Sequence, residues 1–202
     1  VEMATRHAIF GRPGACYLDF PDDIITGECE LDDILQVERV PEPPRTIAPS
    51  ENIEAALDLL ESAERPLALV GKGMAWSQAE DEVRDFIERT QIPFVRSPMG
   101  KGVMPDEHPL AASAARTLAL QQADVIFLMG ARFNWIFHFG LPPRFAPDVK
   151  VIQLDIAPEE IGHNKPSEVA LVGDGKSIMG QLNKALEGRQ WFYPADAPWR
   201  GA

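Results

Sequence analysis

The chain has 202 residues, of which 45% are hydrophobic and 25% are charged, and its formal net charge is −12 at pH 7. This composition is typical of a globular protein that buries a core, and it excludes a chain that is disordered throughout. The acidic balance, with a pI near 4.7, disfavours a general nucleic-acid surface, whereas a local basic site for one small anion stays open.

No segment of the sequence indicates membrane insertion or secretion. No apolar run reaches about 18 residues, and no signal peptide is evident. The two cysteines, Cys16 and Cys29, do not form a CxxC pair, so neither a zinc site nor a disulfide framework is expected. The four histidines have no partner at metal-ligand spacing, so we propose no metal site. We predict an intracellular protein with neither a membrane nor a nucleic-acid partner.

The first 49 residues are interpreted as the end of one domain followed by a linker. Residues 1–10 resemble the end of a helix that lacks an initiator Met and a cap, so we expect a fragment of a longer protein. Residues 11–14 stop this helix, and residues 15–20 read as a short strand that Pro21 ends. Residues 21–49 are rich in proline and acidic residues without a sustained period, which indicates an inter-domain linker.

From Ser50 onward, short apolar segments alternate with amphipathic ones. A helix capped by Ser50 is followed by a strand over 66–70, a helix over 77–90, a strand over 93–95, a helix over 111–122, and strands over 124–129, 149–154 and 169–172, with a last helix over 176–186. This alternation and right-handed crossovers predict an α/β fold, a doubly wound, Rossmann-like parallel sheet of five to six strands. Ligands of such sheets bind outside the carboxyl ends of the strands.

Gly71-Lys72-Gly73 follows a strand and precedes a helix, which is the place of a dinucleotide fingerprint. Glycines there let a phosphate approach the backbone, and the N-terminus of the helix expected after Trp76 would face it. The third glycine is missing, and Arg96 ends the second strand where an NAD site would have an acid. We therefore expect no NAD site, and a tight turn with an exposed lysine is the alternative to a phosphate site.

Three further strand ends carry charged residues. Arg132 suits a phosphate or an adenine face, with an ordinary ion pair as the alternative. Asp155 suits ribose hydroxyls, with a cap for the following turn as the alternative. Gly173-Asp174-Gly175 begins like the diphosphate-and-magnesium motif of thiamine enzymes, but the asparagine pair which that motif needs is missing. We interpret Asp174 as a helix cap near a bound nucleotide.

The segment 133–145 carries too many large apolar side chains for a free surface loop. Exposed apolar patches of this kind usually mark an interface. We expect the loop to pack against another domain or subunit, or to line an acyl-CoA entrance. The alternative is that it folds over the core of its own domain.

Four stretches together resemble one known family. They are residues 11–19 (GRPGACYLD), 70–76 (VGKGMAW), 98–109 (PMGKGVMPDEHP) and 130–143 (GARFNWIFHFGLPP). These are similar to 2-hydroxyacyl-CoA lyase and its relative oxalyl-CoA decarboxylase, both thiamine diphosphate enzymes of the acetolactate synthase superfamily. The last stretch points more narrowly to the lyase, and the resemblance covers nearly the whole chain.

The resemblance implies a domain organisation. Residues 1–25 would be the C-terminal piece of the pyrimidine-binding domain, 26–47 a linker, 48–188 the central domain, and 189–202 the start of a linker to the diphosphate-binding domain. The catalytic glutamate would precede this chain and the motif for thiamine diphosphate and Mg²⁺ would follow it. We therefore expect no catalytic residue here and no activity from the chain alone.

The resemblance also implies an activity and a ligand. The full enzyme would cleave 2-hydroxyacyl-CoA to formyl-CoA and an aldehyde, with thiamine diphosphate as the electron sink. Oxalyl-CoA decarboxylase binds ADP on its central domain, and Arg12 would reach that site from the neighbouring domain. The positions that would hold ADP or a CoA nucleotide are Arg12, Gly71, Lys72, Arg132, Asp155, Asp174 and Gly175.

Other functions stay open from the sequence. They are oxalyl-CoA decarboxylase, a non-catalytic nucleotide-binding or regulatory module, and a central domain of the acetolactate synthase type that would hold FAD. For the full-length enzyme, the resemblance implies an acyl-CoA substrate and a homodimer or homotetramer. It also implies a cytoplasmic location, or a peroxisomal one in a eukaryote.

Overall fold

The structure is a computed structural model that describes residues 1–34, 39–197 and 199. The chain divides into two compact units, Val1–Pro44 and Arg45–Ala202. The described residues of the first unit form three short helices, none of which has a buried residue: α1 (Glu2–Ile9), α2 (Asp22–Thr26) and η1 (Leu31–Asp33).

The strand predicted over residues 15–20 is wrong, because this segment has no regular secondary structure. A strand is stable when its backbone groups pair with a neighbouring strand. Among the described residues, no segment pairs with this one. Its apolar side chains are exposed, with Tyr17 88% accessible, so the local apolar pattern alone did not suffice to form a strand.

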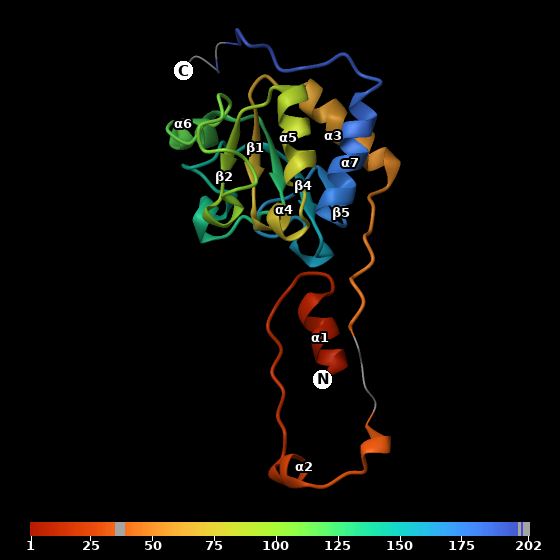
Figure 1. The fold of residues 1–202 in the computed structure, drawn as a ribbon. Helices are drawn as coiled ribbons and strands as arrows, with labels where there is room; N and C mark the ends of the chain where they lie inside the picture. Colours follow the sequence, from red (N-terminus) through yellow and green to blue (C-terminus); the bar gives the residue numbers. More distant parts are fainter. Residues whose placement is uncertain (35–38, 198, 200–202) are drawn as a thin grey trace. The chain divides into compact units, whose positions relative to one another are not determined.

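In the second unit, five strands of the described chain form a wholly parallel sheet in the order β2-β1-β3-β4-β5 (Figure 1). Every strand is short and mostly apolar, and β1 and β3 are buried along their whole length, as parallel strands covered on both faces must be. The predicted α/β fold is thereby confirmed. The strands are β1 (Pro66–Val70), β2 (Phe94–Arg96), β3 (Val125–Met129), β4 (Lys150–Asp155) and β5 (Val169–Val172).

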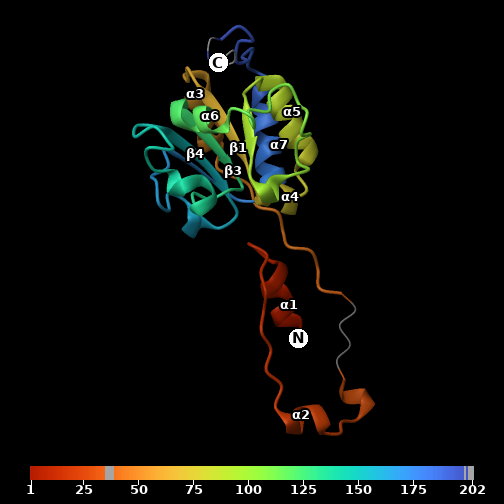
Figure 2. The ribbon, with the colours of Figure 1, turned by 90° about the vertical axis from the view of Figure 1, so that its left-hand side faces the viewer.

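Helices cover both faces of this sheet. One core joins α3 (Ser50–Glu61), α5 (Glu80–Thr90) and α7 (Gly175–Leu186) to one face, and a second core joins α6 (Arg116–Gln122) to the other. Figure 2 shows α5 and α7 on one side of the strands and α6 on the other. Alternate strand residues enter the two cores, so that Phe127 lies in the first and Ile126 in the second. The predicted doubly wound arrangement is therefore confirmed.

Two helix starts differ from their predictions. Ser50 is the first residue of α3 and makes no capping hydrogen bond, since Pro49 takes the cap position. The helix predicted over 77–90 is α5, which begins only at Glu80, and a separate short helix, α4 (Lys72–Trp76), precedes it, with the left-handed residue Gln78 (φ 55°) between the two. The helical backbone therefore begins at Lys72 rather than after Trp76. None of the helices in the described part of the chain combines the length and apolar character that crossing a membrane requires.

The segment after α7 has neither helix nor strand through residue 197, yet it is firmly attached. Tyr193 is only 4% exposed. Its N–H donates to the carbonyl of Thr90 and its hydroxyl donates to the carbonyl of Glu64, each at 2.7 Å. Arg189 binds three carboxylates on α3, those of Glu54, Asp58 and Glu61.

Candidate functional site

The carboxyl ends of four neighbouring strands lie level with one another. Val70 pairs with Met129, Met129 with Leu154, and Asp155 with Val172. The loops that follow β1, β3, β4 and β5 therefore share one edge of the sheet. This edge carries six of the predicted ligand-binding residues: Gly71, Lys72, Arg132, Asp155, Asp174 and Gly175.

Arg12 lies in the first unit, so its predicted contact with a nucleotide stays a prediction.

The glycines after β1 and β3 pack directly against one another. A Cβ atom on Gly71 would lie 2.3 Å from the carbonyl oxygen of Gly130, and one on Gly73 would lie 2.7 Å from the Cα of Gly130. The N–H of Gly71 donates to Met129 at 2.8 Å, and that of Gly73 donates to Gly130 at 2.9 Å. These glycines thus bring two loops into backbone contact, and their amides are already paired with carbonyl groups.

Lys72 and Arg132 supply the positive charge of this edge. The ammonium of Lys72 is exposed and lies 5.0 Å from the centre of the Trp76 ring, a cation–π contact. The Nη1 atom of Arg132 donates to Oε1 of Glu160 at 2.9 Å. The ion pair considered as the alternative for Arg132 is therefore present. A pair at such a partly exposed position contributes little to stability.

Asp155 is buried at the end of β4. Its Oδ1 atom accepts a hydrogen bond from the N–H of Ala157 at 3.0 Å. The turn cap considered as the alternative is therefore present. Its contact with a ribose stays a prediction.

Asp174 is the N-cap of α7, as predicted. Its Oδ1 accepts hydrogen bonds from the N–H and the hydroxyl of Ser177, both at 2.9 Å. Arg45 Nη1 lies 2.9 Å from Oδ1 and 3.1 Å from Oδ2. A carboxylate held by these donors fits a helix cap and does not fit a magnesium ligand of thiamine diphosphate. Among the residues that the structure describes, no group of three or more His, Cys, Asp or Glu side chains could hold a metal ion.

Gly175 packs closely against α4. A Cβ atom at this position would lie 2.5 Å from side-chain atoms of both Met74 and Ser77. This glycine thus allows the start of α7 to approach the end of α4.

The apolar loop over 133–145 folds mostly over its own unit, so the predicted interface is wrong for most of its aromatic residues. Phe133, Phe137 and Phe145 are buried in the core beneath α6, and the rings of Phe133 and Phe145 meet edge to face at 5.3 Å. Within η3 (Trp135–Gly140), His138 and Phe139 have left-handed backbone angles, and Phe137 before them is buried. Trp135 remains 74% exposed.

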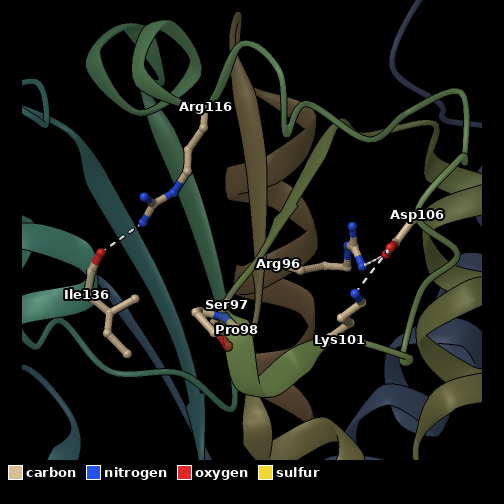
Figure 3. A pocket seen from close by; sticks show the side chains of 7 residues that line it. All are labelled: Arg96, Ser97, Pro98, Lys101, Asp106, Arg116 and Ile136. Carbon is tan, nitrogen blue, oxygen red and sulfur yellow. Dashed lines mark hydrogen bonds and ion pairs between the residues drawn. The ribbon is translucent and has the colours of Figure 1, made fainter.

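A pocket of about 290 Å³ opens at the carboxyl end of β2 (Figure 3). Sequence reasoning placed Arg96 at this strand end but used it only as an argument against NAD. It assigned no role to the other side chains, which come from the loop after β2, from the start of α6 and from η3. The lining residues are Arg96, Ser97, Pro98, Lys101, Asp106, Arg116 and Ile136.

A single carboxylate serves two cations in this pocket. Asp106 forms a short hydrogen-bonded ion pair with Nη1 of Arg96, and its Oδ2 lies 3.7 Å from Nζ of Lys101. The hydrogen bond from Arg96 is the main reason that the pKa of Asp106 lies below its ordinary value. The Arg96 side chain is only 11% exposed, and its Nε has no hydrogen-bond partner among the described residues. Because Arg96, Lys101 and Arg116 line the pocket with Asp106 as the acidic residue, positive charge exceeds negative charge there.

Comparison with known proteins gives consistent matches. The family model described as "Thiamine pyrophosphate enzyme, central domain" matches residues 53–182. Human 2-hydroxyacyl-CoA lyase 1 is 45% identical over 98% of this chain and 34% of its own length. Oxalyl-CoA decarboxylase from Escherichia coli K12 is 42% identical over 98% of this chain and 35% of its own length. The chain thus spans about a third of the length of the curated relatives it matches.

Proposed function

The chain belongs to the thiamine pyrophosphate enzyme family through its central domain, and we propose that it serves within a 2-hydroxyacyl-CoA lyase. The observation that carries this proposal is the match of nearly the whole chain to relatives with that name. The segment 130–143 supports the proposal, because it points to the lyase more specifically than the other three stretches do. In this proposal residues 48–188 form the central domain.

The proposed reaction cleaves a 2-hydroxyacyl-CoA to formyl-CoA and an aldehyde. Thiamine diphosphate, with Mg²⁺, would supply the electron sink when bound. Because Asp174 is held as a helix cap, we assign no step through that cofactor to the residues described. The contribution proposed for this chain is to bind ADP or the nucleotide part of a coenzyme.

The nucleotide would lie along the edge of the sheet where β1, β3 and β4 end. Lys72 and Arg132 would bind its phosphates, and the carboxylate of Asp155 would accept hydrogen bonds from its ribose hydroxyls. The net charge of −12 is compatible with such a site, because charges further away than about 8–10 Å are largely screened at physiological salt. The exposed ammonium of Lys72 and the exchangeable Arg132–Glu160 pair support this placement.

Asp155→Ala should weaken ADP binding about tenfold or more, because it removes one or two charge-assisted hydrogen bonds worth roughly 1.5–3 kcal/mol each. Calorimetric titration of ADP into the wild type and the variant measures the change. Asp148→Ala is the matched control, since this exposed carboxylate precedes β4 at the opposite edge of the sheet. Asp155→Asn keeps a side chain that can cap the turn, so it separates ribose binding from folding. Equal ADP affinity of the wild type and the folded Asp155→Ala variant would show that Asp155 does not contact the nucleotide.

The proposed reaction is tested on the protein that contains this chain, supplied with thiamine diphosphate and Mg²⁺. A lyase should release an aldehyde from a 2-hydroxyacyl-CoA, whereas oxalyl-CoA decarboxylase activity would release carbon dioxide from oxalyl-CoA. The second activity is a candidate because the bacterial decarboxylase is nearly as similar in sequence. The 202-residue chain alone should release no aldehyde. Release of carbon dioxide without release of an aldehyde would contradict the proposed lyase activity and support decarboxylase activity instead.

A further inference from the structure

We propose that the pocket at the end of β2 binds the phosphate group of a phosphate ester or diphosphate through Arg96 and Lys101, and that this group displaces Asp106. The inference goes beyond the proposed function, because it concerns the end of β2 and not the ends of β1, β3 and β4. In this proposal the carboxylate of Asp106 fills the anion site when no phosphate is bound.

The first argument is the surplus of hydrogen-bond donors. Arg96 is almost fully buried and has one N–H, on Nε, without a partner among the described residues. Buried donors are nearly always paired in folded proteins, and leaving one unpaired is destabilising. A tetrahedral phosphate offers more acceptor oxygens than a carboxylate, and a guanidinium binds it with matched geometry.

The second argument is that only one of the two cations holds Asp106 by a hydrogen bond. This carboxylate is about half exposed and belongs to the loop after β2. Its distance of 3.7 Å to Lys101 is too long for a hydrogen bond, so the ammonium has room for a better acceptor. Figure 3 shows Arg96 and Lys101 pointing toward Asp106 from the same part of the pocket. An incoming phosphate would therefore meet both cations where the carboxylate now lies.

The third argument concerns Arg116, which lies on the other side of the pocket (Figure 3). Its Nη2 donates to the carbonyl of Ile136 at 2.8 Å, and its guanidinium stacks 5.4 Å from the centre of the Phe137 ring. These contacts fix its charge beside the pocket. We assign Arg116 no direct contact with the phosphate, but the positive potential of its guanidinium favours an anion in the pocket.

The test uses inorganic pyrophosphate as the probe, titrated calorimetrically into the protein in a buffer without phosphate or divalent cations. Arg96→Gln should weaken binding about tenfold or more, because it removes charged hydrogen bonds. Asp106→Asn should strengthen binding, because it removes the competing carboxylate. Asp81→Asn is the matched control, since Asp81 is also an exposed carboxylate paired with an arginine and its loss changes the net charge equally.

Lys72→Gln distinguishes this pocket from the proposed nucleotide site: pyrophosphate binding that Lys72→Gln weakens and Arg96→Gln leaves unchanged would place the probe at the nucleotide site and overturn the proposal. Equal affinities of the Asp106→Asn and Asp81→Asn variants would overturn the proposal, since they would show an effect of net charge only. The same comparison decides the matter if Arg96→Gln fails to fold. No heat from millimolar pyrophosphate with either wild type or Asp106→Asn would also overturn it.

Discussion

Phe127→Ala should lower the free energy of unfolding by about 3–5 kcal/mol, the usual effect of removing a large aromatic side chain from a core. Phe127 lies in the middle of β3 with strands on both sides, and its side chain is fully buried. Its ring meets that of Phe86 on α5 edge to face, with the centroids 5.7 Å apart. The variant therefore loses both the burial and the contact between sheet and helix.

Urea denaturation followed by circular dichroism measures this effect. Phe192→Ala provides the control, because the same side chain is removed from a position that is 61% exposed. Its unfolding free energy should stay within about 0.5 kcal/mol of the wild type. Similar losses in the two variants would contradict the central place of Phe127 in the core.

Gly71→Ala should destabilise the protein by about 1–3 kcal/mol or more, as overpacking does in a site that cannot relax. The added methyl group would lie 2.3 Å from the carbonyl oxygen of Gly130 and 2.5 Å from the Cβ of Ala131. The backbone of Gly71 has an ordinary φ of −110°, so the expected loss comes from the clash and not from backbone strain. The loops after β1 and β3 would have to separate.

Gly180→Ala is the opposite case within the same chain. Gly180 lies inside α7, and a Cβ atom there would meet nothing within 4 Å. Alanine in a helix interior is favoured over glycine by about 0.5–1 kcal/mol, so this variant should gain stability. The two alanine variants are compared by the midpoint of thermal unfolding. A Gly71→Ala protein as stable as Gly180→Ala would exclude close packing of the two loops.

The sheet could be predicted because each strand is an apolar run in its own right. Strands buried on both faces, such as 66–70 and 125–129, stand out from the polar helices between them. The handedness of the crossovers then sets the layers. Residues 15–20 show the limit of this reasoning, since the same local pattern formed no strand where the described residues provide no pairing partner.

The candidate site was predictable only where topology decides it. The residues at the strand ends follow from the parallel order, so Lys72 and Asp155 could be placed at one edge. The role of Gly71 could not be predicted, because it depends on contact with Gly130, a residue remote in the sequence. The Arg96–Asp106 pair was missed for another reason, since Asp106 lies in a glycine- and proline-rich loop whose path has no sequence signature.

The attachment of the segment after α7 has a consequence for any shortened version of the protein. Removal of the residues beyond Leu186 would leave α3 with three neighbouring carboxylates and no guanidinium between them. Like charges at such helical spacing repel one another. The carbonyl groups of Thr90 and Glu64 would also lose the donors that Tyr193 provides. A sound truncation therefore retains the chain through at least Tyr193, seven residues past the last residue of the final helix.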